Sequence, residues 1–126
     1  IGVRVFGKDL KELFENAAFA MFDIIADLEG MTGETTETFK VEAADPEGLL
    51  VAWLDELLYI FYTKQLIFYK FNIEQLADGS LRASVVGRPI AANRNRLKTE
   101  IKAATYSDLK IKKTADGYSV EVIFDV

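Results

Sequence analysis

The sequence predicts an α+β domain in which two helices pack on a largely antiparallel β-sheet. Residues 9–28 and 45–63 carry apolar side chains at helical spacing. The stretches around them alternate apolar and polar residues, as half-buried strands do. Asp-Gly pairs at 78–79 and 116–117 indicate tight turns between strands. The predicted element order is β-α-β-α-β-β-β-β-β.

The second predicted helix organises the rest of the chain. Asp45 is a suitable N-cap, and Pro46 then occupies the first helical position, where its missing N–H is no loss. Trp53, the only tryptophan, lies inside the apolar stripe, so we expect it in the core rather than in a partner interface. Asp55 and Glu56 fall on the side that we expect to face solvent, which argues against a membrane span. The stripe consists of Leu49, Leu50, Trp53, Leu54, Leu57, Leu58 and Phe61.

The first predicted helix begins at Asp9, with Glu12 three residues later in capping-box spacing. We expect it to end at Gly30. Phe19 falls on its polar side and is expected to be exposed. The predicted strands cover residues 1–6, 36–43, 66–76, 81–85, 97–106, 109–113 and 118–126.

Composition limits the chemistry that this chain can perform. At 126 residues, half of them apolar, it is one domain over residues 1–126 with a substantial core. It has no cysteine and no histidine, which excludes thiol nucleophiles, disulfides, zinc fingers and imidazole bases. A metal held by side chains must therefore use oxygen ligands, as calcium, magnesium and manganese do. No signal peptide or anchor is visible, so we expect a cytoplasmic protein.

The charge is unevenly distributed along the chain. The net charge of −5 argues against a general nucleic-acid coat. Residues 94–126, however, carry 7 Lys or Arg against 5 Asp or Glu. This pattern has two interpretations, a basic surface strip or solvated strand faces, and the second is the commoner case.

The sequence contains few candidates for a functional site. It has no phosphate-binding glycine motif and no histidine or cysteine for a nucleophile–base pair, which leaves serine or lysine chemistry open. With the resemblance described below, we expect no enzyme activity. Asp125 is one candidate, because its carboxylate and that of Val126, if Val126 is the terminus, offer ligands for a hard cation. Lys98, Glu100 and Lys102 on one strand face are the other. From the pattern alone, a solvated chain end and a surface charge ladder are the favoured interpretations of these two candidates.

Four segments together resemble the archease family over nearly the whole chain. Residues 7–18 resemble its first helix and residues 49–59 its second. The run K-T-E-I-K-A-A-T-Y at 98–106 resembles the family's most distinctive segment. The ending V-I-F-D-V at 122–126 matches in style and position.

The resemblance implies a function in tRNA splicing and RNA repair. Archease proteins are accessory proteins of the RtcB-type RNA ligase, which joins 3′-phosphate or 2′,3′-cyclic-phosphate ends to 5′-hydroxyl ends with GTP and manganese. They promote guanylylation of the ligase, so that it turns over many times. The family also implies a divalent metal, calcium, held by an N-terminal Asp and by an Asp that Asp125 matches. With Val126 beside it, Asp125 is the predicted metal site, and the predicted ligase-binding residues are Arg94, Lys98, Glu100, Lys102 and Tyr106.

The sequence departs from the family pattern at several places. The family's H-T-A-D-like segment would precede Ile1, so we expect a leading segment with an acidic ligand to be missing here. Ala91 and Asn95 stand where the family often has Asp and His, and Ser107 replaces a common His. These differences are consistent with divergence toward a different ligase partner.

Three alternatives belong to other functional classes. An RNA-binding module would use Arg94, Arg96, Lys98 and Lys102 with Tyr106, and its affinity would fall steeply with salt. A metal-dependent hydrolase centred on Asp125 would need more converging acidic groups than the sequence offers. A chaperone-like module would need a broad exposed apolar patch.

Overall fold

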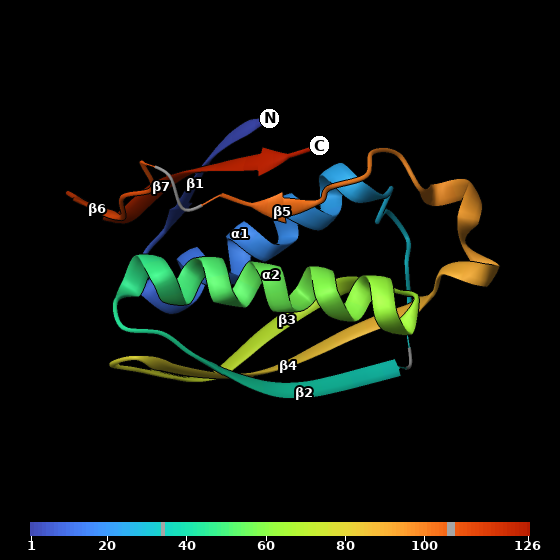
Figure 1. Cartoon of the computed structure of the whole chain (residues 1–126), viewed down its shortest axis with the longest axis horizontal. Helices are drawn as coiled ribbons and strands as arrows, with labels where there is room; N and C mark the ends of the chain where they lie inside the picture. Colours follow the sequence, from blue (N-terminus) through green and yellow to red (C-terminus); the bar gives the residue numbers. More distant parts are fainter. Residues whose placement is uncertain (34, 106–107) are drawn as a thin grey trace.

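The computed structural model describes residues 1–33, 35–105 and 108–126. Figure 1 shows its elements, and their order along the chain confirms the predicted alternation of strands and helices. The elements are β1 (Gly2–Gly7), α1 (Leu10–Ile25), β2 (Thr35–Glu42), α2 (Pro46–Lys64), β3 (Leu66–Ala77), β4 (Ser80–Pro89), the 3₁₀ turns η1 (Ile90–Ala92) and η2 (Arg94–Arg96), β5 (Ala103–Ala104), β6 (Lys112–Thr114) and β7 (Gly117–Asp125).

The two helices form a middle layer between two antiparallel sheets (Figure 1). One sheet has the order β1-β7-β5, and β6 also pairs with β7. The other has the order β2-β4-β3. The predicted α+β class is confirmed, and the structure adds that the strands divide between two sheets. Neither helix in the described part of the chain is long and apolar enough to cross a membrane.

Both helix N-termini are capped as the sequence predicts. The Asp9 carboxylate accepts the Glu12 N–H at 2.8 Å, and the Asp45 carboxylate accepts the Gly48 N–H at 2.6 Å. Such side chains satisfy main-chain donors that have no partner within the helix. The capped ends fix where each helix enters the middle layer.

Trp53 joins the two helices at the centre of the core. Its side chain is fully buried, as predicted, and its indole N–H donates to the Phe14 carbonyl of α1 at 2.9 Å. The Phe39 ring of β2 stacks on the indole with 5.6 Å between ring centroids. One residue therefore ties α2 to α1 and to the β2-β4-β3 sheet.

Helix α1 ends at Ile25, and the predicted end at Gly30 is wrong. Ala26 has extended backbone angles, and the segment that follows pairs with another part of the chain. The Asp27 N–H donates to the Arg96 carbonyl at 2.8 Å, and the Lys98 N–H donates to the Ile25 carbonyl at 2.7 Å. Because these bonds satisfy the main chain outside the helix, continuing the helix offers no advantage.

The predicted strand over residues 97–106 is largely wrong. Within its described part only Ala103 and Ala104 form a strand, paired with Phe124 and Asp125 of β7. Leu97 instead forms a bridge to Ala26. The segment is extended but runs from α1 to β7, so residues 98–102 have no single neighbouring strand with which to form a ladder.

The Asp78-Gly79 turn is confirmed, and the second turn is present but shifted by one residue, with Ala115 and Asp116 in the loop and Gly117 paired with Thr114. Gly79 joins β3 to β4 with φ at +76°, and Gly117 begins β7 with φ at +147°. These are backbone angles that residues with a Cβ rarely adopt. The described strand before the second turn, β6, is shorter than the predicted 109–113 and shifted to Lys112–Thr114.

The first prediction concerns Trp53. We expect Trp53→Phe to lower the free energy of unfolding by about 2 kcal/mol, because it removes a buried hydrogen bond and leaves a void. Urea unfolding measures the change. Phe19→Ala is the control, since Phe19 is 47% exposed and should change stability by less than about 0.5 kcal/mol. Equal effects of the two substitutions would contradict this account of the core.

Candidate functional site

The segment from Leu97 to Thr105 is held by main-chain bonds to α1 and β7 and by two side chains of α2. The Tyr62 hydroxyl donates to the Ile101 carbonyl at 2.8 Å. The Ala104 N–H donates to Asp55 Oδ1 at 3.0 Å. These contacts fix the main chain of the segment at two points, and they leave Lys98, Glu100 and Lys102 exposed.

A third contact extends this anchoring beyond the segment. The Ile111 N–H donates to Glu47 Oε2 at 3.1 Å. Glu47, Asp55 and Tyr62 are spaced by 8 and 7 residues, so they lie along one side of the helix. Helix α2 therefore provides a row of partners for a chain segment that is too irregular to form a ladder.

The sequence interpretation of Asp55 was wrong. We expected a solvent-facing carboxylate, but the side chain is half-buried and accepts the Ala104 N–H. Burial raises the pKa of the Asp55 carboxyl, and the hydrogen bond from Ala104 opposes part of that rise. The spacing of Glu47, Asp55 and Tyr62 is what a row of hydrogen-bonding side chains on one side of the helix would show. An exposed polar stripe gives the same spacing, so the sequence alone does not distinguish the two.

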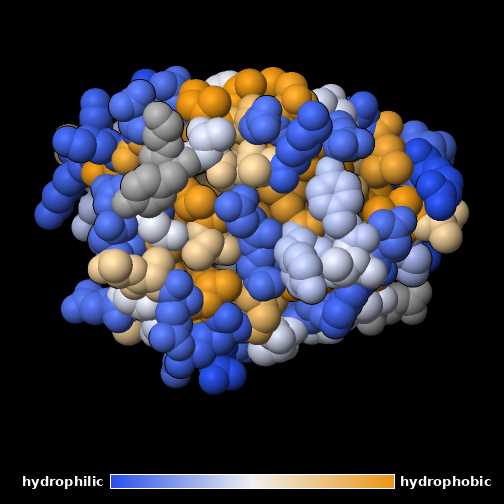
Figure 2. All heavy atoms as spheres, viewed as in Figure 1, coloured by the Kyte–Doolittle hydropathy of each residue, from blue (hydrophilic) through white to orange (hydrophobic). Residues whose placement is uncertain are grey.

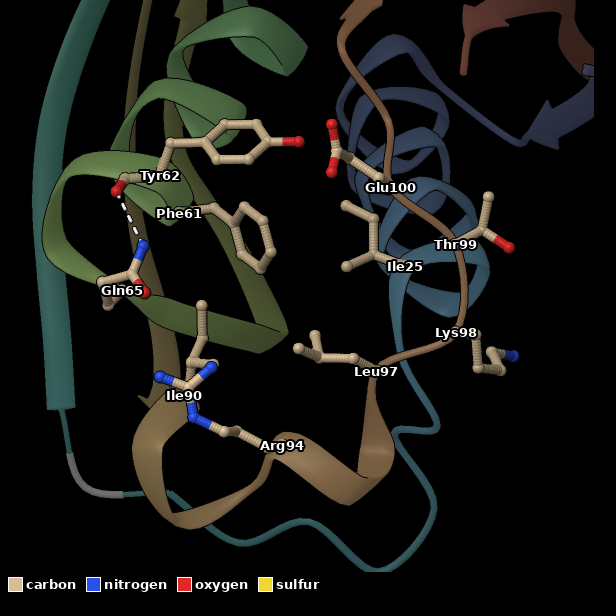
Figure 3. A pocket seen from close by; sticks show the side chains of 10 residues that line it. All are labelled: Ile25, Phe61, Tyr62, Gln65, Ile90, Arg94, Leu97, Lys98, Thr99 and Glu100. Atoms are coloured by element: carbon tan, nitrogen blue, oxygen red, sulfur yellow. Dashed lines mark hydrogen bonds between the residues drawn. The ribbon is translucent and has the colours of Figure 1, made fainter.

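Tyr62 stays a hydrogen-bond donor at neutral pH. Burial, and then the negative charge of Glu100, raise the pKa of its phenol. Figure 3 shows the Glu100 carboxylate pointing toward the Tyr62 hydroxyl from the opposite side of a hollow. The contact with Ile101 is therefore retained across the physiological pH range.

The hollow of Figure 3 lies where α1, α2, the 3₁₀ turns and residues 97–100 meet. Its volume is about 340 Å³. Ile25, Phe61 and Ile90 form its buried floor. Arg94, Lys98 and Glu100 line it too, so three of the predicted partner-binding residues share one concave site.

The predicted site residues do not all point into the hollow. Figure 3 shows the Lys98 side chain pointing away from the hollow, although Lys98 is part of its wall. Lys102 lies at the β5–β7 edge, where its N–H donates to the Asp125 carbonyl at 2.7 Å. Asp125 and Val126 are exposed at the end of β7. Tyr106 lies outside the described residues.

The metal site stays a prediction. Among the residues that the structure describes, no three or more acidic side chains come together as a metal-binding group. Asp125 provides one carboxylate, whereas calcium takes about six to eight oxygen ligands. The described residues do not by themselves fit a calcium ion.

Comparison with known proteins decides the family. The model of the Archease protein family matches residues 1–126. The chain belongs to the archease family. It is 41% identical to the archease of Methanosarcina acetivorans over 125 residues, which cover 96% of this chain and 86% of that protein. The archease of Pyrococcus furiosus is 38% identical over 121 residues, covering 93% and 84%.

Solved structures agree with this assignment. The solution structure of Methanobacterium thermoautotrophicum protein 1598 superimposes with a TM-score of 0.75 at 29% identity, covering 99% of this chain and 89% of that one. The crystal structure of an archease from Thermotoga maritima, described as a possible chaperone, gives 0.68 at 22% identity, covering 100% and 90%. The arrangement of two sheets around two helices is thus the fold of archease proteins.

The second prediction concerns Asp55. Because folding raises its pKa, the stabilising contribution of this carboxyl is complete below the unfolded pKa of about 3.9 and is lost as pH rises through the folded pKa. Asp55→Asn keeps an oxygen for the Ala104 N–H but carries no charge. We expect the stability of the natural chain relative to this variant to fall as pH rises through the unfolded pKa and then the folded pKa. Urea unfolding at several pH values measures the difference, and a difference that rises with pH would contradict the assignment.

Proposed function

We propose that this archease-family protein is a non-catalytic accessory protein of an RtcB-type RNA ligase. It promotes guanylylation of the ligase, so that the ligase turns over many times in tRNA splicing and RNA repair. Family membership over the whole chain supports this proposal. The composition is consistent with it, since a chain without histidine or cysteine has no imidazole base and no thiol nucleophile.

The observation that carries the proposal is that α1, α2 and β7 together hold residues 97–105. Two side-chain hydrogen bonds fix the main chain, while Lys98, Glu100 and Lys102 stay exposed. A recognition surface built on a fixed segment loses less conformational entropy on binding than one on a mobile loop. We call Arg94, Lys98, Glu100 and Lys102, with Asp125 beside them at the β5–β7 edge, the activation surface.

The activation surface would act through differential binding. An activator needs no chemistry of its own if it binds the guanylylation-competent state of the ligase better than the other states. Charges of both signs at defined positions suit a protein partner, because they specify orientation as well as attraction.

Two alternatives are less well supported. Direct RNA binding is disfavoured by the net charge of −5 and by Glu100 and Asp125 within the activation surface. A general chaperone needs a broad apolar area. On the face that Figure 2 shows, apolar areas are small and separated by charged groups.

Multiple-turnover RNA ligation tests the proposal. The ligase of the same source would be limiting, with GTP and manganese present, and product would be followed with and without this chain. We expect many products per ligase only with the chain, together with faster formation of the guanylylated ligase. Absence of stimulation, also with upstream residues added, would overturn the proposal.

The third prediction concerns Asp125. We expect Asp125→Ala to abolish stimulation of the ligase and to leave the fold intact, because the side chain is exposed at the strand end. Glu121→Ala is the matched control, since it removes an exposed carboxylate from the same face of β7. Full stimulation by a folded Asp125→Ala variant would remove Asp125 from the activation surface.

A further inference from the structure

We propose that the hollow between α2 and residues 94–100 is a socket for an apolar side chain of the ligase. An acidic group next to that side chain would pair with Arg94. This inference rests on the proposed function, because it names the chemistry that the partner presents to the activation surface. Nothing in the family assignment identifies this hollow as a binding site.

The floor of the socket is apolar and already buried. Ile25 is 1%, Ile90 4% and Phe61 7% exposed. The side chains at the entrance are different, since Leu97 and Tyr62 are 39% and 40% exposed. An incoming apolar group would cover both entrance side chains and meet a floor from which water is already largely excluded, which is the environment of binding hot spots.

Hydrogen bonds fix the positions of the walls of the socket. Leu97 lies between two main-chain contacts with the end of α1, from Asp27 to Arg96 and from Lys98 to Ile25. The opposite wall is fixed where the Tyr62 hydroxyl donates to Ile101. The volume of about 340 Å³ is therefore a feature of the fold and does not depend on an occupant to open it.

The charges at the entrance define the partner further. Within the described residues, Arg94 forms no ion pair, and its side chain extends along the hollow toward Ile90 (Figure 3). Glu100 lies on the other side, close to Tyr62. An acidic residue of the partner is attracted to the Arg94 side and repelled from the Glu100 side, so the charges fix the direction in which the partner segment crosses the entrance.

A protein segment fits these features better than a nucleic acid. The floor is aliphatic apart from Phe61, and Glu100 repels a phosphate backbone. The Lys98 side chain, which would have added positive charge, points away from the hollow (Figure 3). An apolar anchor with a neighbouring carboxylate satisfies both the floor and Arg94.

Binding and ligation measured together test the socket. We expect Leu97→Glu to raise the Kd for the ligase at least about tenfold and to lower stimulation to the same extent at limiting chain, because a charge at the entrance opposes an apolar side chain. Phe19→Glu is the matched control, an exposed apolar residue on α1 that does not line the hollow, and should keep the natural Kd. Urea unfolding of both variants checks that each is folded.

Arg94→Ala provides the second variant, because an exposed arginine can be removed without disturbing the core. We expect a weaker affinity for the ligase and a smaller dependence of Kd on salt, since one ion pair is lost.

If the natural chain stimulates the ligase and both Leu97→Glu and Arg94→Ala bind like the natural chain, the socket is overturned while the proposed function stands. Loss of RNA affinity with unchanged ligase affinity would also overturn it, in favour of an RNA site. A natural chain that neither binds nor stimulates the ligase would overturn both.

Discussion

Helix α2 packs against both sheets and α1 at once, and the rest of the structure depends on that constraint. Its buried side chains contact both sheets and α1. At the edge of the buried arc, Glu47 and Asp55 accept hydrogen bonds from Ile111 and Ala104, and Tyr62 donates one to Ile101. A segment held in this way need not form a regular strand. The contacts with α2, together with the pairing of Arg96 and Lys98 with the end of α1, give residues 97–102 their irregular path, which leaves a hollow beside the helix end.

The class and the element order were predictable because each depends on local patterns. Caps at Asp9 and Asp45, and turns at Gly79 and Gly117, are decided by residues within a few positions of one another. The division into two sheets was less accessible. The buried positions of α2 span about half of its circumference, which is wider than one sheet needs. The width of this buried arc predicts a helix that packs against other elements on two sides, but periodicity alone does not say which strands lie on which side.

The errors occur where distant segments compete for the same main-chain groups. The alternating pattern of residues 97–106 resembles that of a strand, and the pattern up to Gly30 resembles that of a helix. In the structure, Ile25 and Asp27 pair with Lys98 and Arg96, so one contact shortens both predicted elements. Patterns within a short stretch of sequence do not predict that contact, because its partners are about seventy residues apart. The same contact builds a wall of the hollow, so the sequence-based error and the candidate site have one physical origin.

This shared origin explains why candidate residues could be chosen from the sequence while their grouping could not. The patterns placed Arg94 and Glu100 among the charged residues of one segment, but only the turn at η2 and the pairing with α1 bring both to the same hollow. Lys98 and Lys102 alternate with apolar neighbours as predicted, yet one points away from the hollow and the other lies at the edge of β7. A partner that contacts both the hollow and the edge of β7 must follow the main chain between them. From Glu100 to Lys102 this main chain extends only about 7 Å. The hollow and the charged residues of the activation surface from Arg94 to Lys102 therefore lie along one stretch of main chain, which α1, α2 and β7 hold in place.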